Sequence, residues 1–294
     1  MIASGSTLLV DASVYIFRYY FALPARWQSR TGMDTEAVQG FTGFLLDLIE
    51  TRPARLACAF DESLGSCFRN ELYPDYKCSR VLPDEALAFQ LAACHSMAET
   101  LGIACYAHDR YEADDLLASL TRTCASEGPL VVSRDKDLAQ LLASGAAGIW
   151  DAAANEIHDT ASTRARFGVA PEQIPDYLAL VGDSIDDIPG VPGVGAKTAA
   201  RLLGHFPDVE SLIAGVAEVA GLPLRGAAGI AARLEAHSEQ IRMAKALATL
   251  AADAPAATRA DDLAWHSPGA DLPIAFAAEL GLSPAVQARM ERLL

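Results

Sequence analysis

The sequence predicts an α/β fold with a parallel sheet flanked by helices, followed by a second, helical region. Three observations predict it. Short apolar runs alternate with helical periodicity in the first half, several of these runs end at an aspartate, and strand patterns stop near residue 171. A length of 294 residues also suits about two domains. We therefore expect one domain over 1–170 that contains the sheet and a helical region over 171–294.

Four apolar runs in the first half are typical of buried strands. Helical patterns separate them: Val38, Phe41, Leu45, Leu48 and Ile49 fall on one helix face. A further helix is expected over 84–101, and another over 116–124. Between them, residues 62–83 are polar, basic and aromatic without periodicity, which predicts a long excursion from the sheet. The expected strands are 7–10, 56–60, 130–133 and 147–150.

The second half has helical patterns and glycine-rich turns. Ser283 followed by Pro284 is a helix start signal for the last helix. Residues 251–271 are rich in Ala, Asp and Pro, which predicts an extended surface connection. The expected helices are 171–180, 196–203, 208–214, 227–250, 272–280 and 284–294.

Composition limits the class of protein. No apolar run approaches the ~18 residues of a membrane span, and the N-terminus lacks the features of a signal peptide. We therefore expect a cytoplasmic protein with no membrane partner. The formal net charge of −15 would disfavour a nucleic-acid partner if it were spread evenly over the surface.

The acidic residues are not spread evenly, however. Nine of them fall at predicted strand ends or at helix starts beside those ends: Asp11, Asp61, Glu112, Asp114, Asp115, Asp135, Asp137, Asp183 and Asp186. Each alone is equally well explained by a solvated turn or a favourable helix N-terminus. Together they would meet at one edge of a parallel sheet and repel one another unless cations neutralise them.

Carboxylate oxygens without paired His or Cys suit Mg²⁺ or Mn²⁺. Two such ions about 3.5–4 Å apart can stabilise the attacking and leaving oxygens of a phosphodiester. Setting these nine charges aside changes −15 to −6, so the net charge does not exclude a DNA partner.

Residues 189–199 predict a helix–hairpin–helix. Its glycines, Gly190, Gly193 and Gly195, would let the backbone approach a phosphate, and Lys197 adds a cation near the start of the next helix. The alternative is a tight turn that joins two packed helices. Such a hairpin would bind the DNA backbone without reading its sequence.

At this point the chain resembles a known family. Six motifs occur in order: Leu9-Val10-Asp11, Ala59-Phe60-Asp61, Phe68-Arg69-x-Glu71-Leu72-x-x-x-Tyr76-Lys77, Glu112-Ala113-Asp114-Asp115, Asp135-Lys136-Asp137, and the stretch from Gly182 to Gly195. Over essentially its whole length the sequence resembles the 5′-nuclease (flap endonuclease) family, and in particular the 5′→3′ exonuclease domain of bacterial DNA polymerase I.

The resemblance implies a structure-specific 5′→3′ exonuclease or flap endonuclease. Such enzymes cleave branched or 5′-ended DNA with two metal ions and leave 5′-phosphates. It implies a PIN-like nuclease domain over 1–170, with a helical arch over about 62–101, and a helix–hairpin–helix DNA-binding region over 171–294 that holds a K⁺ ion. We also expect a monomer. All nine acidic residues would surround the metals, and Asp11, Asp61, Asp114 and Lys77 would be catalytic. DNA contacts would come from Arg18, Arg69, Tyr76, Lys77, Arg80, Gly190, Gly193, Gly195 and Lys197.

Two departures and three alternatives stay open. Val81-Leu82 stands where many relatives carry prolines, and Asp187 replaces a frequent Asn. No polymerase domain follows and the chain begins at Met1, which favours a stand-alone nuclease. The alternatives are a non-catalytic binder of branched DNA, a PIN-type ribonuclease and an aspartyl-nucleophile phosphatase. The last is disfavoured because Asp11-Ala12-Ser13 lacks a second Asp.

Overall fold

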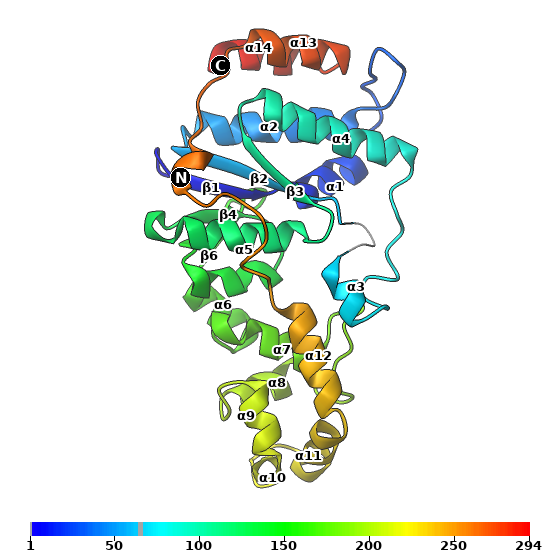
Figure 1. The fold of residues 1–294 in the computed structure, drawn as a ribbon, viewed down its shortest axis with the longest axis vertical. Coiled ribbons are helices and arrows are strands. Elements are labelled where there is room, and N and C mark those ends of the chain that lie inside the picture. Colours follow the sequence, from blue (N-terminus) through cyan, green and yellow to red (C-terminus); the bar gives the residue numbers. More distant parts are fainter. Residues whose placement is uncertain (1, 64–66) are drawn as a thin grey trace.

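A six-stranded sheet organises the first half of the chain in the computed structural model, which describes residues 2–63 and 67–294 (Figure 1). The strand order is β3-β2-β1-β4-β5-β6. The first five strands are parallel, and β6 pairs antiparallel with β5. The predicted parallel sheet is confirmed. The strands are β1 (Thr7–Asp11), β2 (Arg55–Asp61), β3 (Ala104–His108), β4 (Leu130–Val132), β5 (Gly148–Asp151) and β6 (Glu156–His158).

Strands β3 and β6 were not predicted, and both are edge strands. Strand β3 is only half-buried along its whole length, and β6 has just three residues. A strand with no fully buried face leaves no continuous apolar run in the sequence, so its pattern is weak.

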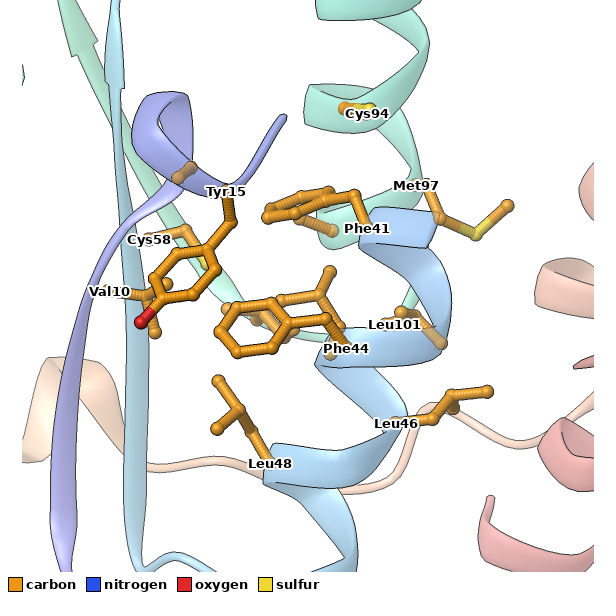
Figure 2. Packing of buried hydrophobic residues seen from close by; sticks show 14 of the residues in the cluster. Val10, Tyr15, Phe41, Phe44, Leu46, Leu48, Cys58, Cys94, Met97 and Leu101 are labelled. Atoms are coloured by element: carbon orange, nitrogen blue, oxygen red, sulfur yellow. The ribbon is translucent and has the colours of Figure 1, made fainter. Parts of the chain in front are cut away.

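One face of the sheet is covered by α1 (Ala12–Ala22), α2 (Glu36–Glu50) and α4 (Glu85–Thr100). Figure 2 shows this core, in which Tyr15 stacks on Phe44 with ring centroids 4.1 Å apart. Helices α13 (Asp271–Glu279) and α14 (Pro284–Leu293) lie outside this layer, against α4 and α2 (Figure 1).

The packing of α4 shortens the segment that can form the predicted arch over 62–101. Because Cys94 and Met97 are fully buried in the sheet core, α4 belongs to the sheet layer. Within the described part of this segment, α3 (Phe68–Leu72) and the turns that follow it approach α5 and α12, whereas His95 of α4 stacks on Phe60 near the carboxyl end of β2. Residues 64–66 lie outside the described residues.

The other face is covered by α5 (Ala113–Thr123), η1 (Ala125–Glu127) and η2 (Asp137–Ser144). The connection over 251–271 crosses the same side and contains η4 (Ala260–Leu263). It was expected at the surface, but Ala254 and Leu263 are buried against this layer. Small alanine side chains let this segment pack on the layer at these points, while the rest of the connection is partly or fully exposed, as expected.

The second half forms a helical region with its own core (Figure 1). Helix α12 packs along α7, which brings the end of α12 close to the sheet. The predicted helix over 227–250 is divided into two helices at His237. The elements are α6 (Thr160–Phe167), η3 (Pro171–Gln173), α7 (Ile174–Val181), α8 (Ala196–Leu203), α9 (Val209–Ala214), α10 (Val216–Val219), α11 (Ala227–Ala236) and α12 (Ser238–Ala248).

None of the helices within the described residues combines the length and apolar character that crossing a membrane requires.

Candidate active site

The site lies where the order of the sheet reverses, between β1 and β4. In open α/β sheets, ligands bind outside the carboxyl ends of strands at such a point. Asp11 ends β1 and also caps α1. The Ser133 hydroxyl, just after β4, donates to Asp11 Oδ2 at 2.8 Å and accepts from the Asp135 backbone N–H at 3.0 Å. Ser133 therefore holds two acidic residues from neighbouring strands together.

Further carboxylates gather around this point. Glu112 caps α5, Asp114 lies in its first turn, and Asp135 and Asp137 follow β4. A cavity of about 30 Å³ is lined by Glu112, Asp114, Asp135, Asp137 and Asp186 among others. Asp61, at the end of β2, accepts a bond from the Ser63 hydroxyl at 3.0 Å.

Several of these carboxylates lack a positive partner. Asp11, Asp61, Asp114 and Asp135 form no ion pair with any residue of the described part of the chain. Burial raises the pKa of Asp11 and Asp114, and the charge of Asp135 raises both further. Burial and the charge of Glu112 likewise raise the pKa of Asp61.

Buried oxygen ligands held close together without counter-charge suit a hard divalent cation. Across residues 2–63 and 67–294, no three acidic, His or Cys side chains already surround one point as a metal site. The carboxylate oxygens are therefore the kind of ligand that such ions prefer, but they would have to move closer together to coordinate an ion.

Two lysines neutralise the other carboxylates. Lys136 Nζ lies 3.1 Å from Asp137 and 2.9 Å from Asp183. Lys77 Nζ pairs with Glu112 and lies 3.5 Å from Asp186. Burial opposes ionisation of Glu112, but Lys77 and Arg69 hold its pKa below the usual range. Lys136 has the same effect on the buried Asp183.

Lys136 was missed as a site residue, although its place between Asp135 and Asp137 in the sequence is a signal that could have identified it. Lys77, which the resemblance predicts to be catalytic, pairs with Glu112 because the turn after α3 brings it against the start of α5.

Arg69 and Asp115 have a different role from the predicted one. The Arg69 side chain is 1% exposed, and its two Nη atoms donate to the Asp115 carboxylate at 2.8 and 2.7 Å. Its Nε donates to the Leu247 carbonyl at 2.7 Å and its Nη2 to the Thr249 carbonyl at 3.1 Å. Asp115 is fully buried and also accepts from the Ala251 N–H.

These bonds correct two predictions. Arg69 does not reach the surface where DNA would lie, and Asp115 directs its carboxylate to Arg69 instead of to a metal. We call Arg69, Glu112 and Asp115, with the two carbonyls of 247 and 249, the arginine anchor. It joins α3, α5 and the end of α12.

The other predicted DNA contacts near the site are either buried, as Arg69 is, or exposed. Tyr76 is 4% exposed, and its hydroxyl donates to Glu112 at 2.9 Å, so its predicted DNA contact is corrected as well. Arg80 donates to Asp186 at 2.7 Å and stays 41% exposed. Arg18 on α1 is exposed. With Lys77, Asp61 and Leu82, Arg80 lines a cavity of about 310 Å³ beside the carboxylates.

The two departures from the family pattern lie near this cavity. Val81 is 94% exposed and Leu82 is 65% exposed. Asp187 has a φ of 55°, a left-handed conformation that Asn and Asp adopt more readily than most residues. Its carboxylate accepts from the Ser79 N–H at 2.9 Å, so it fastens the turn after α3 to the hairpin segment.

The glycines of the hairpin have separate functions. A Cβ at Gly190 would lie 2.4 Å from the Val181 backbone, so this position requires glycine for internal packing, and its backbone is partly exposed. Gly193 has a φ of +76°, which favours glycine. Gly195 has a φ of −95° and precedes α8 with open space around it. Lys197 is exposed on the first turn of α8.

Known proteins resemble the chain over nearly all of this architecture. Residues 6–168 match the 5′-3′ exonuclease N-terminal resolvase-like domain, and residues 169–271 match the 5′-3′ exonuclease C-terminal SAM fold. The DNA polymerase I of Pseudomonas aeruginosa is 39% identical over 277 residues, covering 93% of this chain and 30% of that protein. The enzyme of Bacillus subtilis is 34% identical over 289 residues, covering 95% and 32%. The chain thus spans less than one third of the length of these relatives.

Solved structures share the fold. A bacteriophage T5 flap endonuclease, crystallised in a complex with DNA and metal ions, has 18% identity and a TM-score of 0.67, covering 98% of this chain and 97% of its own. The catalytic core of Rad2 in complex with DNA substrate has 15% identity and a TM-score of 0.68, covering 99% and 93%. With both of its domains matched in order, the chain belongs to the 5′-3′ exonuclease family, which includes flap endonucleases.

Proposed function

We propose that the chain hydrolyses DNA phosphodiester bonds at or near free 5′ ends, leaving 5′-phosphates, with two divalent cations, Mg²⁺ or Mn²⁺, as cofactors. The observation that carries the proposal is the group of buried carboxylates without counter-charge at the point where the sheet order reverses. Family membership supports the reaction, and the T5 and Rad2 complexes support DNA as the substrate class.

The carboxylates divide into two groups. Asp11, Asp61, Asp114 and Asp135 lack ion-pair partners among the described residues and would hold one cation. Asp137, Asp183 and Asp186 would hold the second, after Lys136 and Lys77 release them. Divalent cations at such a site lower the pKa of bound water and neutralise phosphate charge.

Basic side chains around the cavity would place the substrate. Lys77, once released from Glu112, would approach the phosphate whose bond breaks and stabilise the charge that develops on it. Arg80 and Arg18 are exposed enough to bind neighbouring phosphates. Lys197, at the start of α8, would bind the duplex arm beyond the site.

The finer parts of the proposal concern assembly and the hairpin. We assign the chain to the cytoplasm as a monomer that binds branched or 5′-ended DNA, with K⁺ at the hairpin. Replacing K⁺ with Na⁺ should weaken duplex binding without affecting single-stranded DNA, and light scattering of the DNA complex measures its stoichiometry.

The test of the reaction is cleavage of labelled 5′-flap, nicked, overhanging and single-stranded DNA, with Mg²⁺ or with EDTA. We expect cleavage only with the metal. Asp11→Asn should lower the rate by at least about 10²-fold, as for removal of other groups that stabilise transition-state charge. Asp271→Asn is the matched control, because Asp271 is exposed at the start of α13, which packs against α4 and α14 outside the sheet layer.

Binding of branched DNA without cleavage in any divalent metal would contradict the proposal and favour a non-catalytic binder. Faster cleavage of an RNA flap than of the matching DNA flap would favour a ribonuclease.

A further inference from the structure

A second cavity, of about 260 Å³, lies beside the carboxylate cluster and belongs to none of the roles assigned above. Three segments enclose it: the turn after β4, the β5–β6 pair and helix α6, which packs against β6 and η2. Its lining includes Arg134, Lys136, His158, Ser162, Arg166 and Phe167. Figure 1 shows α6 between the β6 edge of the sheet and the helical region.

This cavity is distinct from the small acidic one. The acidic cavity is lined by Arg69, Tyr76 and residues of α12, whereas the second cavity is lined by α6 and the β5–β6 pair. Asp135 lines both, so the two lie back to back at the carboxyl end of β4. A group bound in the second cavity would therefore sit close to the reaction without occupying the metal site.

Basic residues predominate in its lining, although the chain as a whole carries −15. Arg134 Nε lies 3.1 Å from Asp151, which leaves the rest of a half-exposed guanidinium available. Lys136 is held by Asp137 and Asp183. Arg166 forms no ion pair with any residue that the structure describes, and it is exposed on α6. Its guanidinium lies 5.2 Å from the centre of the Phe167 ring.

The chemistry of these groups selects a class of ligand. A planar guanidinium presents paired N–H donors that match a phosphate, and Arg166 has no carboxylate that competes for them within the described residues. The His158 ring can add a further hydrogen bond. Ile149 and Phe167 supply an apolar wall, which suits a phosphate that carries a sugar or base.

We propose that this cavity binds a phosphate group of a nucleic acid, with Arg166 as its principal ligand. The proposal rests on the proposed function, because that function brings nucleic acid to the neighbouring site. Two sources share the chemistry: a backbone phosphate of the bound DNA, or the 5′-phosphate of a released mononucleotide.

The test uses Arg166→Glu and Arg164→Glu in the full chain. Both arginines are exposed on α6, and only Arg166 lines the cavity, so Arg164→Glu controls for the same change of charge on the same helix. All binding is measured in EDTA, which excludes metal-dependent effects. The probes are deoxyadenosine 5′-monophosphate by calorimetry and a nicked duplex by fluorescence anisotropy across a salt series.

For a nucleotide source, we expect Arg166→Glu to weaken monophosphate binding by at least tenfold and Arg164→Glu by less than twofold. For a DNA source, we expect Arg166→Glu to weaken duplex binding and to lower the salt slope by about one phosphate contact more than Arg164→Glu does. Either result supports the cavity and identifies its ligand.

Equal effects of the two variants on both probes would overturn the proposal. Arg166→Gln provides a second, milder variant in case the charge reversal perturbs α6, and it should show the same specificity over Arg164→Gln. These binding assays do not measure cleavage. If the protein fails to cleave DNA, Arg166→Glu can still show its specific loss of binding, so failure of the proposed function and failure of this proposal are distinguishable.

Discussion

The arginine anchor and the unpaired carboxylates (Asp11, Asp61, Asp114 and Asp135) both contain buried acidic residues, and the two regions meet at adjacent positions of α5, Asp114 and Asp115. Asp115 is fully buried and has both oxygens bonded, whereas Asp114 has a raised pKa and no ion-pair partner among the described residues. The anchor fixes α5 to α3 and α12. The unpaired carboxylates instead keep like charges together at a cost in stability, which is expected of a site that a ligand completes.

The largest expected effect comes from breaking the anchor. Arg69→Met would leave Asp115 and Glu112 buried with less counter-charge, so it should lower the free energy of unfolding by about 3–5 kcal/mol. Urea unfolding in EDTA measures it. Arg80→Met is the control, because its partly exposed pair with Asp186 should contribute about 1 kcal/mol or less. A similar small loss in both variants would remove the distinction between the two regions.

The adjacent pair on α5 gives the sharpest contrast. Asp115→Asn should destabilise the protein, since it removes the bidentate partner of Arg69. Asp114→Asn relieves repulsion and should leave the free energy of unfolding in EDTA unchanged or raise it by about 1 kcal/mol. It should nevertheless lower the cleavage rate by about 10²-fold or more. A destabilised Asp114→Asn would mean that this residue is structural.

The pH dependence of stability tests the same contrast without mutation. Burial raises the pKa of Asp11 and Asp137 from 3.8 to about 7, so the folded state binds more protons than the unfolded state between these values. Stability should therefore fall as the pH rises from 5 to 8 in EDTA. The opposite contribution of Glu112 and Asp183, whose pKa values are lowered, is lost only at more acidic pH.

We expect the melting temperature to fall by about 3 °C or more over this range. Mg²⁺ at pH 8 should recover most of the loss, and Asp114→Asn should flatten the pH profile. A melting temperature that rises from pH 5 to 8 in EDTA would contradict the raised pKa of Asp11 and Asp137.

The smallest effect concerns a cation outside both regions. Lys197 is exposed and forms no ion pair within the described residues, so Lys197→Ala should leave stability unchanged. It should lower the salt slope of duplex binding by about one phosphate contact while single-stranded DNA binds as before. An unchanged slope, measured with Ca²⁺ in place of Mg²⁺, would make the hairpin a structural turn only.

Local patterns predicted much of this molecule. Strands β1, β2 and β4 are buried on both faces, so their apolar runs are continuous, and the aspartates after them mark the carboxyl edge. The helix start at Ser283 and Pro284 is likewise a local signal, and the structure shows the Ser283 side chain capping α14.

What could not be predicted depends on distant partners. Arg69 meets Asp115 and the Leu247 carbonyl, 46 and 178 residues away, so its sequence neighbours do not reveal that it is buried. Gly190 is required by the backbone of Val181, which approaches only after the hairpin folds back. The sequence thus shows which residues are charged, whereas the tertiary fold decides which of these charges are paired.

The arginine anchor also determines how much of the chain must be synthesised before the site can form. Arg69 donates two of its hydrogen bonds to the carbonyls of residues 247 and 249, at the end of α12. A nascent chain that has not yet emerged beyond α12 has the sheet and all nine carboxylates, but it lacks the two carbonyls that complete the hydrogen bonds of Arg69. Because such long-range contacts form late, the acidic edge is assembled after most of the chain has left the ribosome. Partly made copies would therefore have the ligands for cutting DNA without the geometry to do so.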